Sequence, residues 1–150
     1  MTANVLNGFE QTGTDDNKAF FNGTVESNKV VQTIVNTATL AEINAGKTLV
    51  TGIAGKTITV VGFDATVAGT FTTTTSVDLE DTNGTPVAIA TAAVAALTDG
   101  AVLDSTTANV TMGAGFLGTL TAGEGIAVTN TGTAAAGGTS ITYKVDYIIS

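Results

Sequence analysis

The chain of 150 residues contains no cysteine, no histidine and no arginine, and each absence removes a class of function. Without cysteine it has neither a disulfide framework nor a thiolate metal site. Without histidine or cysteine it has no Ser-His or Cys-His nucleophile and no imidazole ligand for zinc. We therefore expect no catalytic residue, no metal and no cofactor, and we expect that the protein is not an enzyme.

Tryptophan is also absent, and the aromatic residues are six phenylalanines and two tyrosines. Two carboxylates alone can hydrolyse a glycosidic bond. No such pair stands out in this sequence, and the aromatic platform on which a sugar usually stacks is missing. The densest acidic segment, residues 78–84, offers oxygen ligands suited to calcium, but Gly84 falls one place late for a calcium-binding loop. We interpret it as the solvated end of a hairpin.

Positive charge is scarce, because five lysines face thirteen acidic residues and the formal net charge is −8. Each contact with a nucleic-acid phosphate needs its own cation, so we expect no nucleic-acid partner. Anionic membrane surfaces are disfavoured for the same reason. No apolar run approaches the ~20 residues of a membrane span. The first residues show neither a cationic nor an apolar signal region, so we expect synthesis in the cytoplasm without an N-terminal signal.

Threonine is abundant instead, with 31 copies beside 18 glycines and a single proline. Threonine, valine and isoleucine are β-branched and suit a pleated strand better than a helix. Turn residues separate the runs of these residues, which predicts an all-β fold: a single β-sandwich or jelly-roll-like domain of about eight short antiparallel strands. The runs are residues 29–37, 48–53, 57–67, 70–79, 102–103, 108–112, 116–120, 125–130 and 139–149.

Local patterns add detail to these strands. The alternation in residues 57–67 changes parity at Val61-Gly62, which predicts a β-bulge. Asn83-Gly84 predicts a type I′ hairpin turn. Residues 131–138 (TGTAAAGG) predict a flexible hairpin loop. In residues 70–79 the alternation places one set on a single face: Phe71, Thr73, Thr75, Val77 and Leu79.

Two segments stay open between alternatives. Residues 39–45 are ambiguous and end at Gly46. Residues 85–99 begin with a possible N-cap, Thr85, and a possible first helical residue, Pro86, followed by an alanine-rich run. The apolar spacing of that run is poor for a helix, so a short helix and an extended segment are equally compatible with it.

Residues 1–28 show neither a strand nor a helix period, and the pattern of residues 29–150 begins at Lys29. We therefore expect two parts, an extended N-terminal arm (1–28) and the β-sandwich domain (29–150). A disordered terminus is the alternative for the arm. Phe9, Phe20 and Phe21 are costly to leave in water, so we expect them to contact a neighbouring subunit.

Three segments resemble small phage virion proteins, namely capsid decoration (cement) proteins, head fibres and related particle components. They are residues 55–63 (GKTITVVGF), 122–130 (AGEGIAVTN) and 140–147 (SITYKVDY). In those families G-K-x-I-x-V opens a long strand, and a glycine-rich turn and strand lead into a terminal strand with a tyrosine. The resemblance covers roughly residues 50–149.

The resemblance implies a β-sandwich or jelly roll, a homotrimer, and a major capsid protein as partner. It also makes the capsid a second possible contact for Phe9, Phe20 and Phe21. The expected location is the virion, on the outside of the capsid, after synthesis in a bacterial host. The function that follows is a decoration protein that stabilises the shell. The alternative is a receptor- or glycan-binding fibre or adhesin module.

Overall fold

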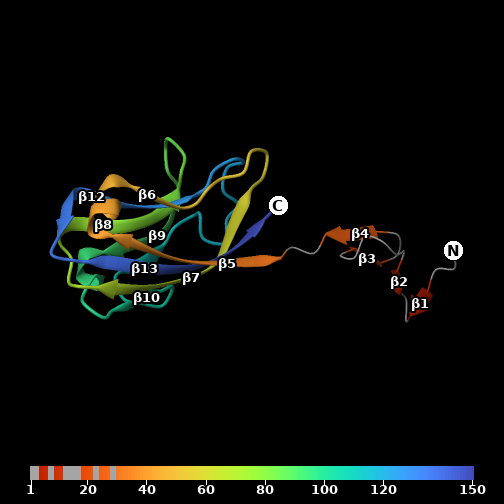
Figure 1. Cartoon of the computed structure of the whole chain (residues 1–150), viewed down its shortest axis with the longest axis horizontal. Coiled ribbons are helices and arrows are strands. Elements are labelled where there is room, and N and C mark those ends of the chain that lie inside the picture. Colours follow the sequence, from red (N-terminus) through yellow and green to blue (C-terminus); the bar gives the residue numbers. More distant parts are fainter. Residues whose placement is uncertain (1–3, 7–8, 12–17, 22–23, 28–29) are drawn as a thin grey trace. The chain divides into compact units, whose positions relative to one another are not determined.

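A computed structural model describes residues 4–6, 9–11, 18–21, 24–27 and 30–150, with side chains from residue 30 onward. The chain divides into two compact units, Met1–Val30 and Val31–Ser150. Figure 1 shows the elements of both units. The larger unit is an all-β sandwich, so the fold class predicted from the sequence is confirmed.

The first unit contains four short strands, which the sequence pattern does not predict. They are β1 (Asn4–Leu6), β2 (Phe9–Gln11), β3 (Lys18–Phe21) and β4 (Thr24–Ser27). They form an antiparallel sheet in chain order. Strands of three or four residues are too short to show the alternation by which a strand is recognised in a sequence.

The second unit consists of two antiparallel sheets. The four-stranded sheet has the order β10-β7-β13-β5, and the five-stranded sheet has the order β11-β9-β8-β12-β6. The strands of the first are β5 (Val31–Thr39), β7 (Ile58–Ala68), β10 (Val102–Asp104) and β13 (Ser140–Ile149). The strands of the second are β6 (Lys47–Val50), β8 (Thr72–Asp81), β9 (Ala88–Ala93), β11 (Val110–Met112) and β12 (Ile126–Ala136).

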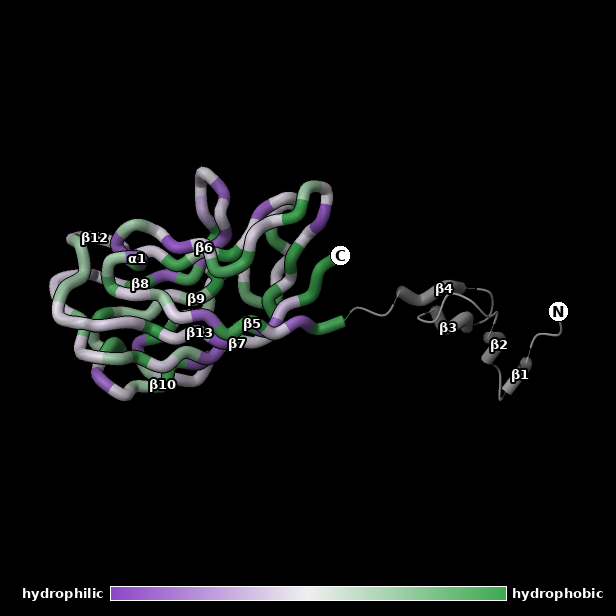
Figure 2. The backbone as a smooth tube through the Cα atoms, in the orientation of Figure 1, coloured by the Kyte–Doolittle hydropathy of each residue, from purple (hydrophilic) through white to green (hydrophobic). Residues whose placement is uncertain are grey.

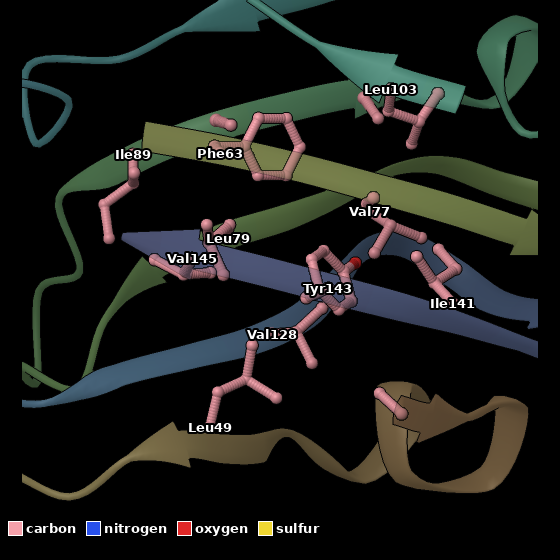
Figure 3. Close-up of a cluster of buried hydrophobic side chains, with 14 of the residues drawn as sticks. Leu49, Phe63, Val77, Leu79, Ile89, Leu103, Val128, Ile141, Tyr143 and Val145 are labelled. Carbon is pink, nitrogen blue, oxygen red and sulfur yellow. The ribbon is translucent and has the colours of Figure 1, made fainter. Parts of the chain in front are cut away.

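The core lies between these two sheets. Alternate residues of the central strand β13, among them Ile141, Tyr143 and Val145, point toward Leu79 of β8 and Val128 of β12 (Figure 3). All five side chains are at most 3% exposed. Burying an aliphatic side chain of this size contributes roughly 1.5–3 kcal/mol, so the alternation that predicts the strands also selects the residues that hold the sheets together.

The bulge predicted at Val61-Gly62 is confirmed. In the pairing of β13 with β7, Asp146 lies opposite Gly62 while Tyr147 lies opposite Val60, so Val61 is the extra residue. A Cβ atom added at Gly62 would lie 2.9 Å from Oδ2 of Asp146. The glycine therefore gives room to the neighbouring strand where the register shifts.

Three predicted details are wrong. Neither Asn83 nor Gly84 has a positive φ, so the turn is not of type I′, which requires positive φ at both central residues. Residues 131–138 are not a flexible loop, because β12 continues to Ala136 and only Gly137, Gly138 and Thr139 separate it from β13. Residues 116–120 form no strand, and only isolated bridges join Phe116 and Thr119 to β7.

The structure decides between the alternatives for the two segments that the sequence leaves open. Residues 40–45 form the short helix α1 (Leu40–Ala45), which begins at the N-cap Thr39 and ends at Gly46 with φ +80°. Residues 85–99 are mainly extended, because they hold β9 and then a single 3-10 turn, η1 (Val94–Ala96). Alanine has a low intrinsic preference for strands, so the pairing of β9 with β8 and β11 determines the extended form.

Candidate functional site

The acidic segment 78–84 is the first candidate, and β8 divides it between two sides of the sheet. Val77 and Leu79 belong to the core (Figure 3), and Asp78 and Glu80 alternate with them on the opposite face. Hydroxyl groups satisfy both carboxylates. Ser76 Oγ donates to the two oxygens of Asp78 at 3.2 and 3.1 Å, and Thr131 Oγ1 donates at 2.6 Å. Thr129 Oγ1 donates to Glu80 at 2.8 Å.

Asp81 holds the loop that follows β8. It is 1% exposed, and its Oδ1 accepts the backbone N–H of Val87 at 2.8 Å and that of Asn83 at 3.4 Å. Thr82 links the same loop to its neighbour, because its hydroxyl donates to Glu124 at 2.6 Å and accepts the N–H of Gly125 at 2.8 Å. The segment expected as a solvated hairpin end is thus partly a buried support for two loops.

Metal binding finds no support in this segment. Among the residues whose side chains the structure describes, no group of three or more acidic side chains is placed to hold a metal ion. The carboxylates of Asp78 and Glu80 accept hydroxyl groups of the sheet, and Oδ1 of Asp81 accepts backbone N–H groups of its own loop. These oxygen atoms stabilise the fold through hydrogen bonds within the chain.

The carboxylates with shifted pKa values also support local structure. The backbone N–H of Thr39, which donates to Glu42 at 2.9 Å, lowers the pKa of Glu42, and the ammonium of Lys47 at 3.0 Å lowers it further. The hydroxyl of Thr106, which donates at 2.7 Å, lowers the pKa of Asp104, and the backbone N–H of Thr106 adds to this. The carboxylate of Glu42 caps α1, and the carboxylate of Asp104 holds the turn after β10.

The aromatic side chains of residues 30–150 lie inside the sandwich. Phe63, Phe71, Tyr143 and Tyr147 are buried, and Phe116 is half-buried against the core. Burial raises the pKa of the Tyr143 hydroxyl far above its usual value. Within this part of the chain, Phe116 alone keeps part of its ring accessible, and no aromatic side chain is exposed as a platform on which a sugar or a base could stack.

The predicted contact residues are placed by their backbone only. Phe9 begins β2, and Phe20 and Phe21 end β3, in the sheet of the first unit. Phe20 is paired with Glu10 of β2 and with Val25 of β4, so the chain brings β2 and β3 together. The contacts expected of these side chains lie outside what the structure describes.

The outer surface along β5 has an apolar character that the sequence pattern does not predict. Exposed valines lie at its start and middle, with Val30 67%, Val31 53% and Val35 66% exposed. Lys144 of β13 lies opposite Val35 and is 3.9 Å from both Asp64 and Asp146. The signal in the sequence is the run VQTIVNTAT, in which no residue is charged.

Comparison with protein-family models, with curated proteins and with solved structures finds no match for this chain. No helix within the described ranges is both long and apolar enough to cross a membrane.

Proposed function

We propose that this protein is a structural component of a phage particle, a decoration protein that binds the outer surface of the capsid shell and stabilises it. In this proposal the protein performs no chemistry. It is made in the bacterial host cytoplasm and its partner is the major capsid protein.

The observation that carries the proposal is the distribution of aromatic residues between the two units. The sandwich of Val31–Ser150 places its five aromatic side chains in or against its own core. The three other aromatic residues, Phe9, Phe20 and Phe21, all lie in Met1–Val30. Aromatic side chains often provide most of the binding energy at a protein interface. The division supports a sandwich that supplies the fold and an N-terminal unit that supplies attachment.

The charge of the chain supports the same class of partner. A net charge of −8 opposes binding to nucleic acid, because each phosphate contact needs its own cation. The sandwich also favours a protein surface over a glycan, because no exposed ring of residues 30–150 offers a platform for a sugar.

Co-sedimentation with capsids tests the proposal. The full chain would be mixed with shells assembled from the major capsid protein of the same phage, and we expect it to pellet with them and to raise their melting temperature. The triple variant Phe9→Ala/Phe20→Ala/Phe21→Ala should bind at least about a hundredfold more weakly, since each lost aromatic anchor costs on the order of 1–2 kcal/mol.

The matched control removes apolar surface from the sandwich. Val102 and Leu117 are 58% and 65% exposed, and the variant Val102→Ala/Leu117→Ala should bind as the natural protein does. Binding that survives the triple variant would contradict the assignment of attachment to the N-terminal unit. Failure of the natural protein to bind shells, together with specific binding to host-cell glycans, would replace the proposal with a receptor-binding role.

A further inference from the structure

Strand β5 is an open edge of the four-stranded sheet. It pairs with β13 through nine consecutive residue pairs with no register shift, and no described strand pairs with its other side. It contains no charge and no proline. The opposite edge of the sheet, β10, has only three residues. Long, regular and uncharged edges are the ones that accept a further strand, because nothing in them opposes pairing.

Hydrogen bonds at the end of β5 reveal which residues face the open side. Lys47 Nζ donates to the carbonyl oxygen of Thr37 at 2.7 Å, and the N–H of Thr39 donates to Glu42 Oε2 at 2.9 Å. Both groups are therefore turned away from β13. Backbone groups of alternate residues in a strand point to the same side. The N–H and C=O groups of residues 31, 33 and 35 consequently point to the open side as well.

The two halves of this edge differ. Lys47 and α1 cover the end of β5 around Thr37 and Thr39. Among residues 30–150 no such hydrogen bond covers the first half, from Val31 to Val35, and its exposed side chains are Val31, Gln32, Thr33 and Val35. Figure 2 shows the apolar start of the strand. The open part is thus a short, uncharged template, and the side chains on the face of Val31, Thr33 and Val35 are all β-branched.

We propose that a second copy of this chain pairs with this edge, antiparallel, about a two-fold axis at Thr33. The segment reads Val31-x-Thr33-x-Val35, the same in both directions. Two-fold pairing places Val31 opposite Val35 of the other copy and Thr33 opposite Thr33. Because all three residues point their backbone groups to the open side, each pair exchanges both N–H···O bonds. The result is one continuous sheet with twice the four strands of each copy.

Charge does not oppose this arrangement at the contact. The nearest charged residues on the same face are Lys144 and Asp146 of β13, one strand away from the axis. Strands lie ≈ 4.7–4.9 Å apart, so the two β13 strands would be about 14 Å apart, beyond the Debye length of about 8 Å. β-branched side chains also pair well across neighbouring strands. A second copy is the occupant that matches this edge in length, side chains and symmetry.

A pair of charge variants tests the proposal in the full chain. Within one copy, Thr33→Lys places an ammonium opposite the carboxylate of Asp146, which tolerates it. Across the two-fold axis, the same ammonium faces the ammonium of the other copy. Thr37→Lys is the matched control, because it makes the same change on the same exposed face outside the paired segment. We expect a dimer of the natural protein and of Thr37→Lys in sedimentation equilibrium, and at least about a tenfold higher dissociation constant for Thr33→Lys, since like charges would face each other.

Cross-linking gives a second and independent readout. The chain has no cysteine, so Thr33→Cys introduces a single thiol whose partner in the dimer is about 5.5 Å away between Cα atoms. That distance allows a disulfide. In Thr37→Cys the two thiols would be eight residue steps apart, about 26 Å. We expect an oxidised dimer for Thr33→Cys and none for Thr37→Cys.

The two-fold pair predicts a dimer, whereas the sequence predicts a homotrimer, so mass alone separates them. Two masses would overturn the proposal, that of a monomer at every concentration and that of a trimer. A dimer whose dissociation constant changes with neither Thr33→Lys nor Thr37→Lys would overturn it as well. If residues 1–29 of the same chain cover the edge, the natural protein stays monomeric, which overturns it too.

Discussion

At the scale of single residues, close packing at glycines explains several features that the sequence pattern cannot show. A Cβ atom added at Gly138 would lie 2.2 Å from the ring of Phe71, so the turn between β12 and β13 passes directly over a core side chain. The predicted alternation of residues 70–79 likewise fails at two positions, Thr73 and Thr75. Thr73 has φ +66° and is exposed with Thr75, whereas Phe71, Val77 and Leu79 are buried. A local change of backbone conformation leaves the composition unchanged, so the sequence does not reveal it.

We predict that Gly138→Ala destabilises the sandwich by about 1–3 kcal/mol, because the added methyl overpacks the Phe71 site. The control is Gly84→Ala, where an added Cβ meets nothing within 4 Å and φ is not positive. It should change the free energy of unfolding by no more than about 0.5 kcal/mol. Urea unfolding followed by circular dichroism measures both variants, and equal stability of the two would show that the close approach is absent.

At the scale of elements, strands with long alternation are predictable and short elements are not. β7 and β13 have ten or more residues each, and their alternation predicts both strands and the bulge in β7. Helix α1 has only six residues and leaves one side chain, Ile43, buried. Its pattern is too short to separate a helix from a strand. The hydrogen bonds that define it, between Thr39 and Glu42, form a capping box.

This cap predicts a dependence of stability on pH. The pKa of Glu42 is lowered in the folded protein, so its contribution is complete above the unfolded value of about 4.3 and is lost as pH falls below it. We predict that Glu42→Gln is less stable than the natural protein at pH 7 and that the difference shrinks toward pH 3. Thermal unfolding at several pH values measures it.

Asp64→Asn is the control for Glu42→Gln, because it removes the same charge from an exposed carboxylate whose contact with Lys144 spans 3.9 Å. It should change stability little at pH 7. A difference between Glu42→Gln and the natural protein that stays constant from pH 7 to pH 3 would contradict the role of the ionised cap.

At the scale of the whole molecule, composition predicts the sandwich but not the separate sheet of the N-terminal unit. The abundance of threonine and the absence of cysteine lead to an all-β domain held by its core, and the structure has one. The sheet of β1 to β4 has strands of three or four residues, and the open edge of β5 depends on which strands pair. Pairing between distant segments is a property of the fold, so no local pattern of the sequence reveals it.

The central claim is that Val31–Ser150 carries the fold and the N-terminal unit carries attachment to the capsid. Removing residues 1–29 tests it most directly, because no strand of the two large sheets begins before Val31. We predict that the shortened protein keeps the circular dichroism spectrum and the unfolding midpoint of the full chain but no longer sediments with capsids. An unfolded shortened protein, or one that still decorates capsids, would contradict the claim.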